Sequence, residues 1–112
     1  MGTVNICELD IVRDDTSCEI KKRNAREIDI VSTETYGFNP GQNMDIHTNL
    51  KINVPDDKIV ILTTDKPLLL IGSPIFEGGK LTLRLHNSRI GKYGAHILSP
   101  GENVCRLTIA SK

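Results

Sequence analysis

Hydrophobic and polar residues alternate along two long segments of the chain, residues 44–53 and residues 80–87. In each segment nearly every second side chain is Met, Ile or Leu, and the side chains between them are polar or charged. A period of two is typical of a β-strand that packs one face on a hydrophobic core and leaves the other face in water. The alternation therefore predicts two half-buried strands.

Two further segments, residues 58–64 and 67–71, contain continuous apolar runs of strand length. Strands of this kind are typically buried on both faces, so we expect these two to lie deeper in the fold or to be paired on both sides. Apolar residues recur at helical spacing nowhere for three turns, and the one candidate for a short helix is residues 21–27. Weaker strands are predicted at residues 4–12, 28–32, 95–98 and 104–110.

Turn sequences separate these segments. Asn39-Pro40-Gly41-Gln42 and Ser99-Pro100-Gly101-Glu102 each place Pro and then Gly at the two central positions. Proline fixes φ where the first position needs it, and glycine accepts the positive φ of the second, which is the pattern of a type II turn. Further turns are expected at residues 55–57 and 77–79. Many short strands separated by turns predict an all-β barrel or sandwich.

The composition narrows the class of protein. The chain has 112 residues, which suits one domain, and its 14 basic and 14 acidic side chains leave no net charge. A nucleic-acid binder, or a protein held on a membrane surface by charge, would carry a basic excess, so we expect neither kind of partner. No apolar stretch reaches the ~18 residues of a membrane-spanning helix, and the first residues show no secretion signal.

The three cysteines, Cys7, Cys18 and Cys105, are an odd number and include no Cys-x-x-Cys pair. This spacing argues against a disulfide framework and against a compact zinc site. A chain with unpaired cysteines fits a reducing compartment, so we expect the cytoplasm or the nucleus.

His47, His86 and Cys105 are the candidates for a metal site or for a Cys–His nucleophilic pair. Both histidines fall on the polar faces of the alternating segments, where a histidine is usually a surface residue. Cys105 shares a face with Leu107 and Ile109, which favours a small hydrophobic residue of the core. No phosphate-binding loop, dinucleotide motif or Gly-x-Ser-x-Gly is present. The residues by themselves indicate no active site, no metal and no cofactor.

Five segments, taken in chain order, share the pattern of a known family. They are residues 27–30, 38–42, 46–55, 79–87 and 100–107. Their order resembles the Gly-x-Asp-Leu, Pro-Pro-Gly-Glu, Val-Pro-Thr-Gly-Leu, Gly-Glu-x-x-Val-x-Leu-x-Asn and Gly-Asp-Arg-Ile-Ala-Gln-Leu motifs of the dUTPase (deoxyuridine triphosphatase) superfamily. The resemblance runs from about Arg26 to Ile109.

The resemblance implies an all-β fold, a compact jelly-roll-like β-barrel of the dUTPase type, with residues 1–112 forming a single domain. Members of that family usually form homotrimers. A homotrimer would give this chain a place to bury apolar runs such as residues 68–71 between subunits. The alternative is that this run is an ordinary central strand of one subunit.

The chain departs from the family at the catalytic positions. Active members carry Asp-x-Asp-Tyr-Arg-Gly where this chain has residues 73–79. Pro74 falls at or beside the Asp that orients the attacking water, and Glu77 falls at the Tyr that packs under the deoxyribose. Asp65-Lys66-Pro67 stands where the family contacts phosphates with Arg-Ser-Gly, and Arg106 replaces a Gln. A proline side chain cannot accept a proton, and the family's Gly-rich C-terminal arm is not found, so the resemblance argues for the scaffold and against the reaction.

Three functions fit these observations. The first is a non-catalytic dUTPase-related protein, a viral or phage accessory protein that binds an unidentified protein partner in the cytoplasm or nucleus. The second is a structural trimer that decorates a virus particle and would be found in the virion. The third is a divergent deoxynucleotide-binding protein or dUTP pyrophosphatase that uses Glu77, Lys66 and Arg106, and only this function would require Mg²⁺.

The binding surface is expected where the resemblance places the nucleotide cleft of the family. Phe76 is one of only two Phe in the chain and lies between Gly72 and Gly78, so we expect it at a hairpin tip. There it would serve as an aromatic anchor for a partner or fold back into a core. The candidate binding residues are Asp65, Lys66, Ser73, Ile75, Phe76, Glu77 and Arg106.

Overall fold

The computed structural model describes residues 2–6, 9–14, 18–72, 75–77, 80–91 and 93–112. Twelve strands run through these residues, and none of the described residues forms a helix, so none provides an apolar helix of membrane-spanning length. The strands are β1 (Gly2–Ile6), β2 (Leu9–Arg13), β3 (Glu19–Lys22), β4 (Glu27–Val31), β5 (Tyr36–Phe38), β6 (Asn43–Asn53), β7 (Lys58–Thr63), β8 (Leu68–Leu70), β9 (Ile75–Glu77), β10 (Lys80–Asn87), β11 (His96–Leu98) and β12 (Asn103–Ser111).

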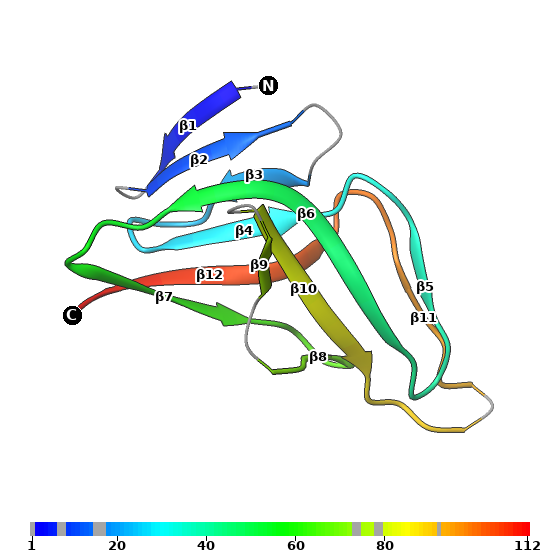
Figure 1. Cartoon of the computed structure of the whole chain (residues 1–112). Coiled ribbons are helices and arrows are strands. Elements are labelled where there is room, and N and C mark those ends of the chain that lie inside the picture. The colour runs from blue at the N-terminus through cyan, green and yellow to red at the C-terminus, as the bar shows by residue number, and fades with distance from the viewer. Residues whose placement is uncertain (1, 7–8, 15–17, 73–74, 78–79, 92) are drawn as a thin grey trace.

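The strands assemble into three antiparallel sheets. A six-stranded sheet has the order β1-β2-β6-β10-β8, with β9 also paired to β10. A four-stranded sheet has the order β3-β4-β12-β7, and β5 pairs with β11 in a two-stranded ribbon. Figure 1 shows β12 passing behind β10, while the β5–β11 ribbon extends to one side. The predicted all-β, jelly-roll-like class is confirmed. The sheets do not close into a complete barrel, because both larger sheets keep edge strands in the described chain.

Both larger sheets pack on one hydrophobic core. Leu81, Leu83 and Leu85 of β10 are completely buried, and they meet residues such as Ile28 and Leu107 from the four-stranded sheet. Burying one such side chain contributes roughly 1.5–3 kcal/mol, so this shared core is what holds the sheets together. The half-buried strands predicted at residues 44–53 and 80–87 are confirmed as β6 and β10.

A bulge interrupts the pairing of β6 with β10. The register shifts between Lys80, which lies opposite Lys51, and Thr82, which lies opposite His47. Asn49 adopts a positive φ of 56° at this point, a conformation that asparagine tolerates better than most residues. Asn49 stands where the dUTPase motif that residues 46–55 resemble has Gly. The positive φ at this position explains why the motif has Gly and this chain has Asn there.

The hydroxyl of Thr48 fixes the bulge from inside the core. Thr48 is completely buried, and its Oγ1 donates a hydrogen bond of 2.6 Å to the carbonyl of Leu81. The same oxygen accepts a bond of 3.3 Å from the amide of Leu50. A buried hydroxyl is costly unless it is hydrogen-bonded, and here it is bonded twice.

The two Pro-Gly turns have the predicted geometry. Gly41 and Gly101 have φ of 75° and 90°. The amide of Gln42 donates to the carbonyl of Asn39 at 3.0 Å, and Glu102 and Ser99 form the same bond at 3.1 Å. In each turn the side chain of the fourth residue also accepts a bond from the amide of the first, at 2.8 Å and 2.7 Å respectively. The same turn is thus built twice.

Each turn also clamps the end of a distant strand. Gly41 donates its amide to the carbonyl of Asn87, and the amide of Asn87 donates back to Gln42, both at 3.0 Å. In the second turn Gly101 and Glu102 make the same pair of bonds with Ser32, at 2.8 Å and 2.9 Å. The turns therefore fix where β10 ends and where the chain leaves β4.

Three local predictions are wrong. The strand predicted at residues 4–12 is a hairpin of β1 and β2, although Cys7 and Glu8 lie outside the described residues. The helix candidate at residues 21–27 is the tight connection between β3 and β4, in which the amide of Arg23 bonds the carbonyl of Glu27 at 2.9 Å. Strands β3, β5 and β9 were not predicted because they are short and lack an alternating pattern.

The apolar runs at residues 58–64 and 67–71 are also different from the expectation. Both form edge strands, β7 and β8, rather than central strands. Every second residue of β7 faces out, with Ile59 and Ile61 41% and 48% exposed, and Leu69 of β8 is 44% exposed. An edge strand of an open sheet has only one face on the core, so a continuous apolar run leaves half of its side chains uncovered.

The turn geometry predicts a specific cost for one substitution. In Gly101→Ala the added methyl group would meet no atom within 4 Å, so only the positive φ resists the change. We expect the free energy of unfolding to fall by about 1–2 kcal/mol, measured by urea denaturation followed by circular dichroism. Gly37→Ala is the matched control, because Gly37 also has open space but no positive φ, and it should change stability by less than about 0.5 kcal/mol. Equal effects of both substitutions would contradict this account of the turn.

Candidate functional site

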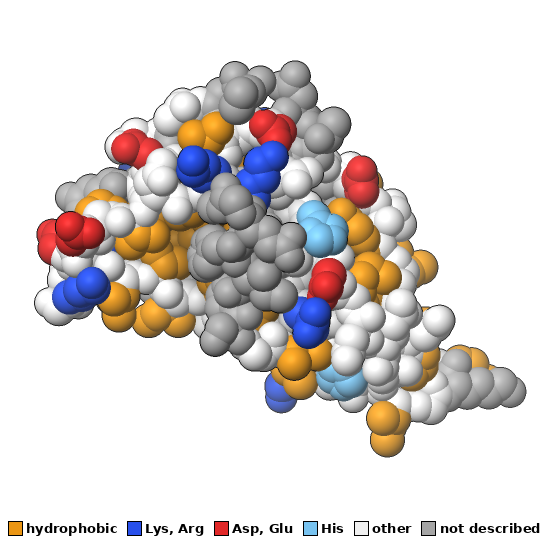
Figure 2. Space-filling model, in the orientation of Figure 1, with side chains coloured by type: hydrophobic (Ala, Val, Ile, Leu, Met, Phe, Trp, Pro, Cys, Tyr) orange, Lys and Arg blue, Asp and Glu red, His pale blue; other side chains and the backbone are white. Residues whose placement is uncertain are grey.

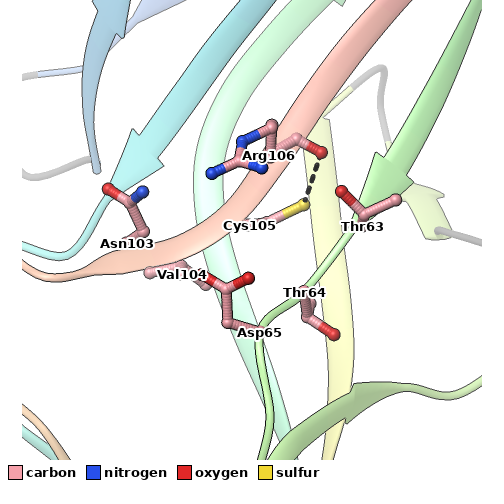
Figure 3. A pocket seen from close by; sticks show the side chains of 7 residues that line it. All are labelled: Thr63, Thr64, Asp65, Asn103, Val104, Cys105 and Arg106. Atoms are coloured by element: carbon pink, nitrogen blue, oxygen red, sulfur yellow. Dashed lines mark hydrogen bonds between the residues drawn. The ribbon is translucent and has the colours of Figure 1, made fainter. Parts of the chain in front are cut away.

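Two of the candidate binding residues, Asp65 and Arg106, line one small pocket at the end of β7 (Figure 3). Pairing of β12 with β7 places Arg106 opposite Thr63, and the chain then leaves β7 through Thr64 and Asp65. The pocket has a volume of about 10 Å³, which is close to the space that one water molecule needs. Its lining is Thr63, Thr64, Asp65, Asn103, Val104, Cys105 and Arg106.

The guanidinium of Arg106 is held by two carboxylates of the neighbouring strand. Pairing of β12 with β4 sets Arg106 opposite Asp29, and Thr108 opposite Glu27. Arg106 Nε lies 3.4 Å from Asp29 Oδ1 and 3.8 Å from Glu27 Oε2, and Arg23 also reaches Asp29 at 3.8 Å. Asp29 is the residue that matches the Asp of the first dUTPase motif. In this fold the negative charge of Asp29 and the positive charge of Arg106 largely offset each other.

Lys66 lies beside the pocket on the short connection from β7 to β8. This connection is tied down at both ends, by the amide of Leu68 bonding the carbonyl of Asp65 at 3.1 Å and by Thr64 Oγ1 donating to the carbonyl of Leu68 at 2.8 Å. Lys66 itself is exposed to solvent. The sequence therefore correctly places Asp65, Lys66 and Arg106 in one neighbourhood.

The other candidates belong to a different sheet. Ile75, Phe76 and Glu77 form β9, opposite Thr82, Leu81 and Lys80 of β10. Ser73 lies outside the described residues, as do Pro74, Gly78 and Gly79. The stretch expected at a hairpin tip thus includes a short strand that pairs with β10, whereas Asp65 and Arg106 line the small pocket.

The remaining candidates for chemistry have structural partners. His47 Nδ1 lies 3.1 Å from Thr82 Oγ1, and His86 Nδ1 lies 2.6 Å from Asn43 Oδ1, both across the β6–β10 pair. Cys105 is buried in the core, as expected, and burial raises the pKa of its thiol to about 12. Within the described part of the chain, no three His, Cys, Asp or Glu side chains are placed to hold a metal ion.

The face in Figure 2 shows acidic and basic side chains interspersed with hydrophobic ones. On the six-stranded sheet, basic side chains likewise lie next to acidic ones and form ion pairs with them. Lys80 Nζ lies 2.9 Å from Asp14 Oδ2, and Arg84 Nε lies 2.8 Å from Asp45 Oδ1. The contact with Arg84 holds the pKa of the Asp45 carboxyl below its usual value. These four charged side chains are thus paired locally on the sheet.

A second, larger cavity was not anticipated from the sequence. It has a volume of about 330 Å³ and lies between the solvent face of β6, the residue before β3 and the connection from β4 to β5. One wall is the polar face of β6, which the alternation in the sequence predicted. The other walls come from segments whose fold the sequence did not predict. Its lining is Cys18, Thr33, Glu34, Tyr36, Asp45, His47 and Asn49.

Solved structures that share this architecture are dUTPases, so the chain has the dUTPase fold. No protein-family model matches the chain. No curated protein matches it either. The resemblance predicted from the sequence is therefore confirmed for the fold.

Several of the similar structures come from bacteriophages. A mutant of the dUTPase of phage phi11 of S. aureus, which coordinates a structural Mg(II) ion, superposes with a TM-score of 0.73 at 17% identity, covering 93% of this chain and 90% of that chain. The Staphylococcus bacteriophage 80alpha dUTPase gives a TM-score of 0.72 at 17% identity, again covering 93% and 90%. That enzyme belongs to the phage dUTPases that control transfer of virulence genes by a proto-oncogenic G protein-like mechanism.

Burial predicts that the two described thiols are inert. It raises the pKa of Cys18 to about 11, with a further contribution from the charge of Glu34, and that of Cys105 to about 12, from an ordinary 9.0. In a Cys7→Ser variant at pH 8, we expect iodoacetamide to alkylate both thiols at least about 100-fold more slowly than in the unfolded chain, because the reactive thiolate is scarce. Mass spectrometry of tryptic peptides measures both rates. Alkylation of Cys18 at the unfolded rate would contradict its burial.

The same shifts fix the sign of a pH dependence. The unfolded thiols ionise near pH 9, whereas the folded ones stay protonated up to about pH 11 and 12. The folded chain then holds more protons than the unfolded chain, so the free energy of unfolding should fall as the pH rises from 9 to 11. Replacing Cys18 with Ala should flatten part of that slope.

Proposed function

We propose that this chain is a non-catalytic protein of the dUTPase fold that acts by binding another protein, as a phage or viral accessory protein. The observation that carries the proposal is the pairing of Arg106 with Asp29 and Glu27 beside the carboxylate of Asp65. A triphosphate site needs positive charge that is free to meet the phosphates. Here the arginine is already committed to carboxylates, and Asp65 adds a charge that repels phosphate.

The residues at the catalytic positions support the same conclusion. By resemblance, Pro74 stands at or beside the position of the water-orienting Asp, and Glu77 stands at the position of the ring that packs under the sugar. Without a side chain that accepts a proton, the attacking water is not activated, and general-base catalysis typically accounts for ~10²–10⁴ in rate.

A phage relative in structure shows that this fold can also serve regulation. Phage 80alpha dUTPase is among the enzymes that control transfer of virulence genes by a G protein-like mechanism, so this fold serves regulation in at least one phage. For the present chain we place the partner surface at Asp65, Lys66 and Arg106, together with residues 72–79. The protein would act in the cytoplasm of the host cell, or in its nucleus.

The first test is catalytic. With dUTP and Mg²⁺, we expect pyrophosphate release at least about 10²-fold slower than that of a phage dUTPase assayed beside it. Release within tenfold of that reference would overturn the non-catalytic assignment. If such activity then disappeared in Glu77→Gln, the divergent pyrophosphatase would become the better description of the protein.

A homotrimer is the second part of the proposal, and it would also suit a protein that decorates a virus particle. The outward side chains of β7, Ile59 and Ile61, form an apolar strip on an edge strand, which favours contact with another subunit.

Light scattering tests the trimer. We expect about three times the subunit mass of 12.4 kDa at micromolar concentration. Ile61→Lys should shift the protein towards the monomer, because a charge would have to be buried in the contact. Ile90→Lys makes the same change at a side chain that is 89% exposed and distant in sequence from β7, and it should leave the mass unchanged. A monomeric wild-type protein would remove both the trimer and the decoration role.

A further inference from the structure

The larger cavity has the dimensions and lining of a small-molecule site. Its volume of about 330 Å³ falls at the lower end of the range for ligand sites. Residues 45, 47 and 49 contribute from the solvent face of β6, and residue 18 lies just before β3. Residues 33 and 34 come from the connection between β4 and β5, and Tyr36 begins β5. None of these residues belongs to the surface proposed above for the protein partner.

The two carboxylates in the cavity differ in their partners. Asp45 is engaged by Arg84, with Nε at 2.8 Å and the terminal nitrogen at 3.4 Å. The carboxylate of Glu34 accepts a bond of 3.3 Å from the hydroxyl of Tyr36, and no cation pairs with it among the described residues. Of the two carboxylates, Glu34 is therefore the one without a direct ion pair among the described residues.

The charge of Glu34 is directed at the cavity walls. After burial itself, Glu34 is the largest influence that raises the pKa of Cys18, and it is likewise the second influence that raises the pKa of Tyr36. Both groups line the same cavity as Glu34, so the carboxylate disfavours a second negative charge at either of them.

The connection that carries Glu34 is held in place before any ligand arrives. Ser32 Oγ bonds the carbonyl of Glu34 and accepts a bond of 3.1 Å from its amide. Ser32 is in turn clamped by Gly101 and Glu102 of the second Pro-Gly turn. Tyr36 is half-buried and packs against the core, so both side chains project from a fixed backbone. Such preorganisation reduces the entropy lost on binding.

The chemistry of the lining selects the class of ligand. Two carboxylates repel anions, and the described side chains form no cluster suited to a metal ion. A flat cation that donates hydrogen bonds fits best, because it can pair with Glu34, lie against the ring of Tyr36 and donate to Asn49. We propose that this cavity binds a guanidinium group, with Glu34 as its ion-pair partner and Tyr36 as its aromatic wall.

NMR titration of the ¹⁵N-labelled chain tests the proposal. The probes are agmatine, the peptide acetyl-Gly-Arg-Gly-amide, and the same peptide with uncharged citrulline in place of Arg. We expect both cations to shift amide signals of residues 33–36 and 45–49, and the citrulline peptide to leave them unchanged. If the arginine peptide binds tenfold tighter than agmatine, the natural ligand is a side chain of a protein; similar affinities indicate a free small molecule.

Substitutions identify the residues responsible. Glu34→Gln should weaken binding of the arginine peptide by about tenfold, the loss expected for one charge-assisted hydrogen bond. Asp56→Asn removes one negative charge from the exposed turn before β7 and should have no effect. Tyr36→Leu should weaken binding without abolishing it. Equal binding by Glu34→Gln, equal binding of the citrulline peptide, or no shifts at tens of millimolar would each overturn the proposal. The result does not depend on whether the chain hydrolyses dUTP.

Discussion

The pairing of β6 with β10 is the constraint on which the rest of the structure depends. β10 contributes the three fully buried leucines that join the two larger sheets, and it also carries β8 and β9 as neighbours. The bulge at Asn49, fixed by the buried hydroxyl of Thr48, sets the register of this pair. A shift of one residue would turn the leucines into solvent and bring the charged residues into the core. The register that buries the leucines on the core face of this pair also sets the positions of residues on its solvent face. The Asp45–Arg84 pair and the wall of the larger cavity lie on that solvent face.

The two candidate sites use charge in opposite ways. At the small pocket the charges are matched within the chain, since Arg106 meets carboxylates on the neighbouring strand. At the larger cavity Glu34 remains without a cation among the described residues. Where charges pair within the chain, a partner recognises the surface mainly by its shape and its contacts. A carboxylate without a cation partner on a rigid backbone instead favours a ligand that is positively charged. The distinction follows from strand register, because register decides which residues stand opposite each other.

The sequence predicted the parts of the fold that local patterns determine. Alternation located β6 and β10, and the Pro-Gly pairs located both turns. The apolar runs of β7 and β8 misled because a run of apolar residues does not reveal whether its strand will have neighbours on both sides. Strands β3 and β5 are held by their partners rather than by their own composition. For the site, resemblance placed Asp65 near Arg106, but the contact of Arg106 with Asp29 depends on cross-strand register between residues 77 positions apart. The larger cavity unites residues 18, 34 and 45 and could not be found from any one segment.

The repeated Pro-Gly turn has a consequence for how such a chain can evolve. Each turn joins a distant strand through amide and carbonyl groups of the main chain, and the demand on sequence is confined to a few positions such as Gly41 and Gly101. At other positions, side chains can be substituted while the main-chain hydrogen bonds of the turns are kept. This tolerance helps to explain how a chain sharing 17% identity with a phage enzyme retains its architecture. Such a fold is maintained by its backbone closures, so many of its surface positions are free to vary.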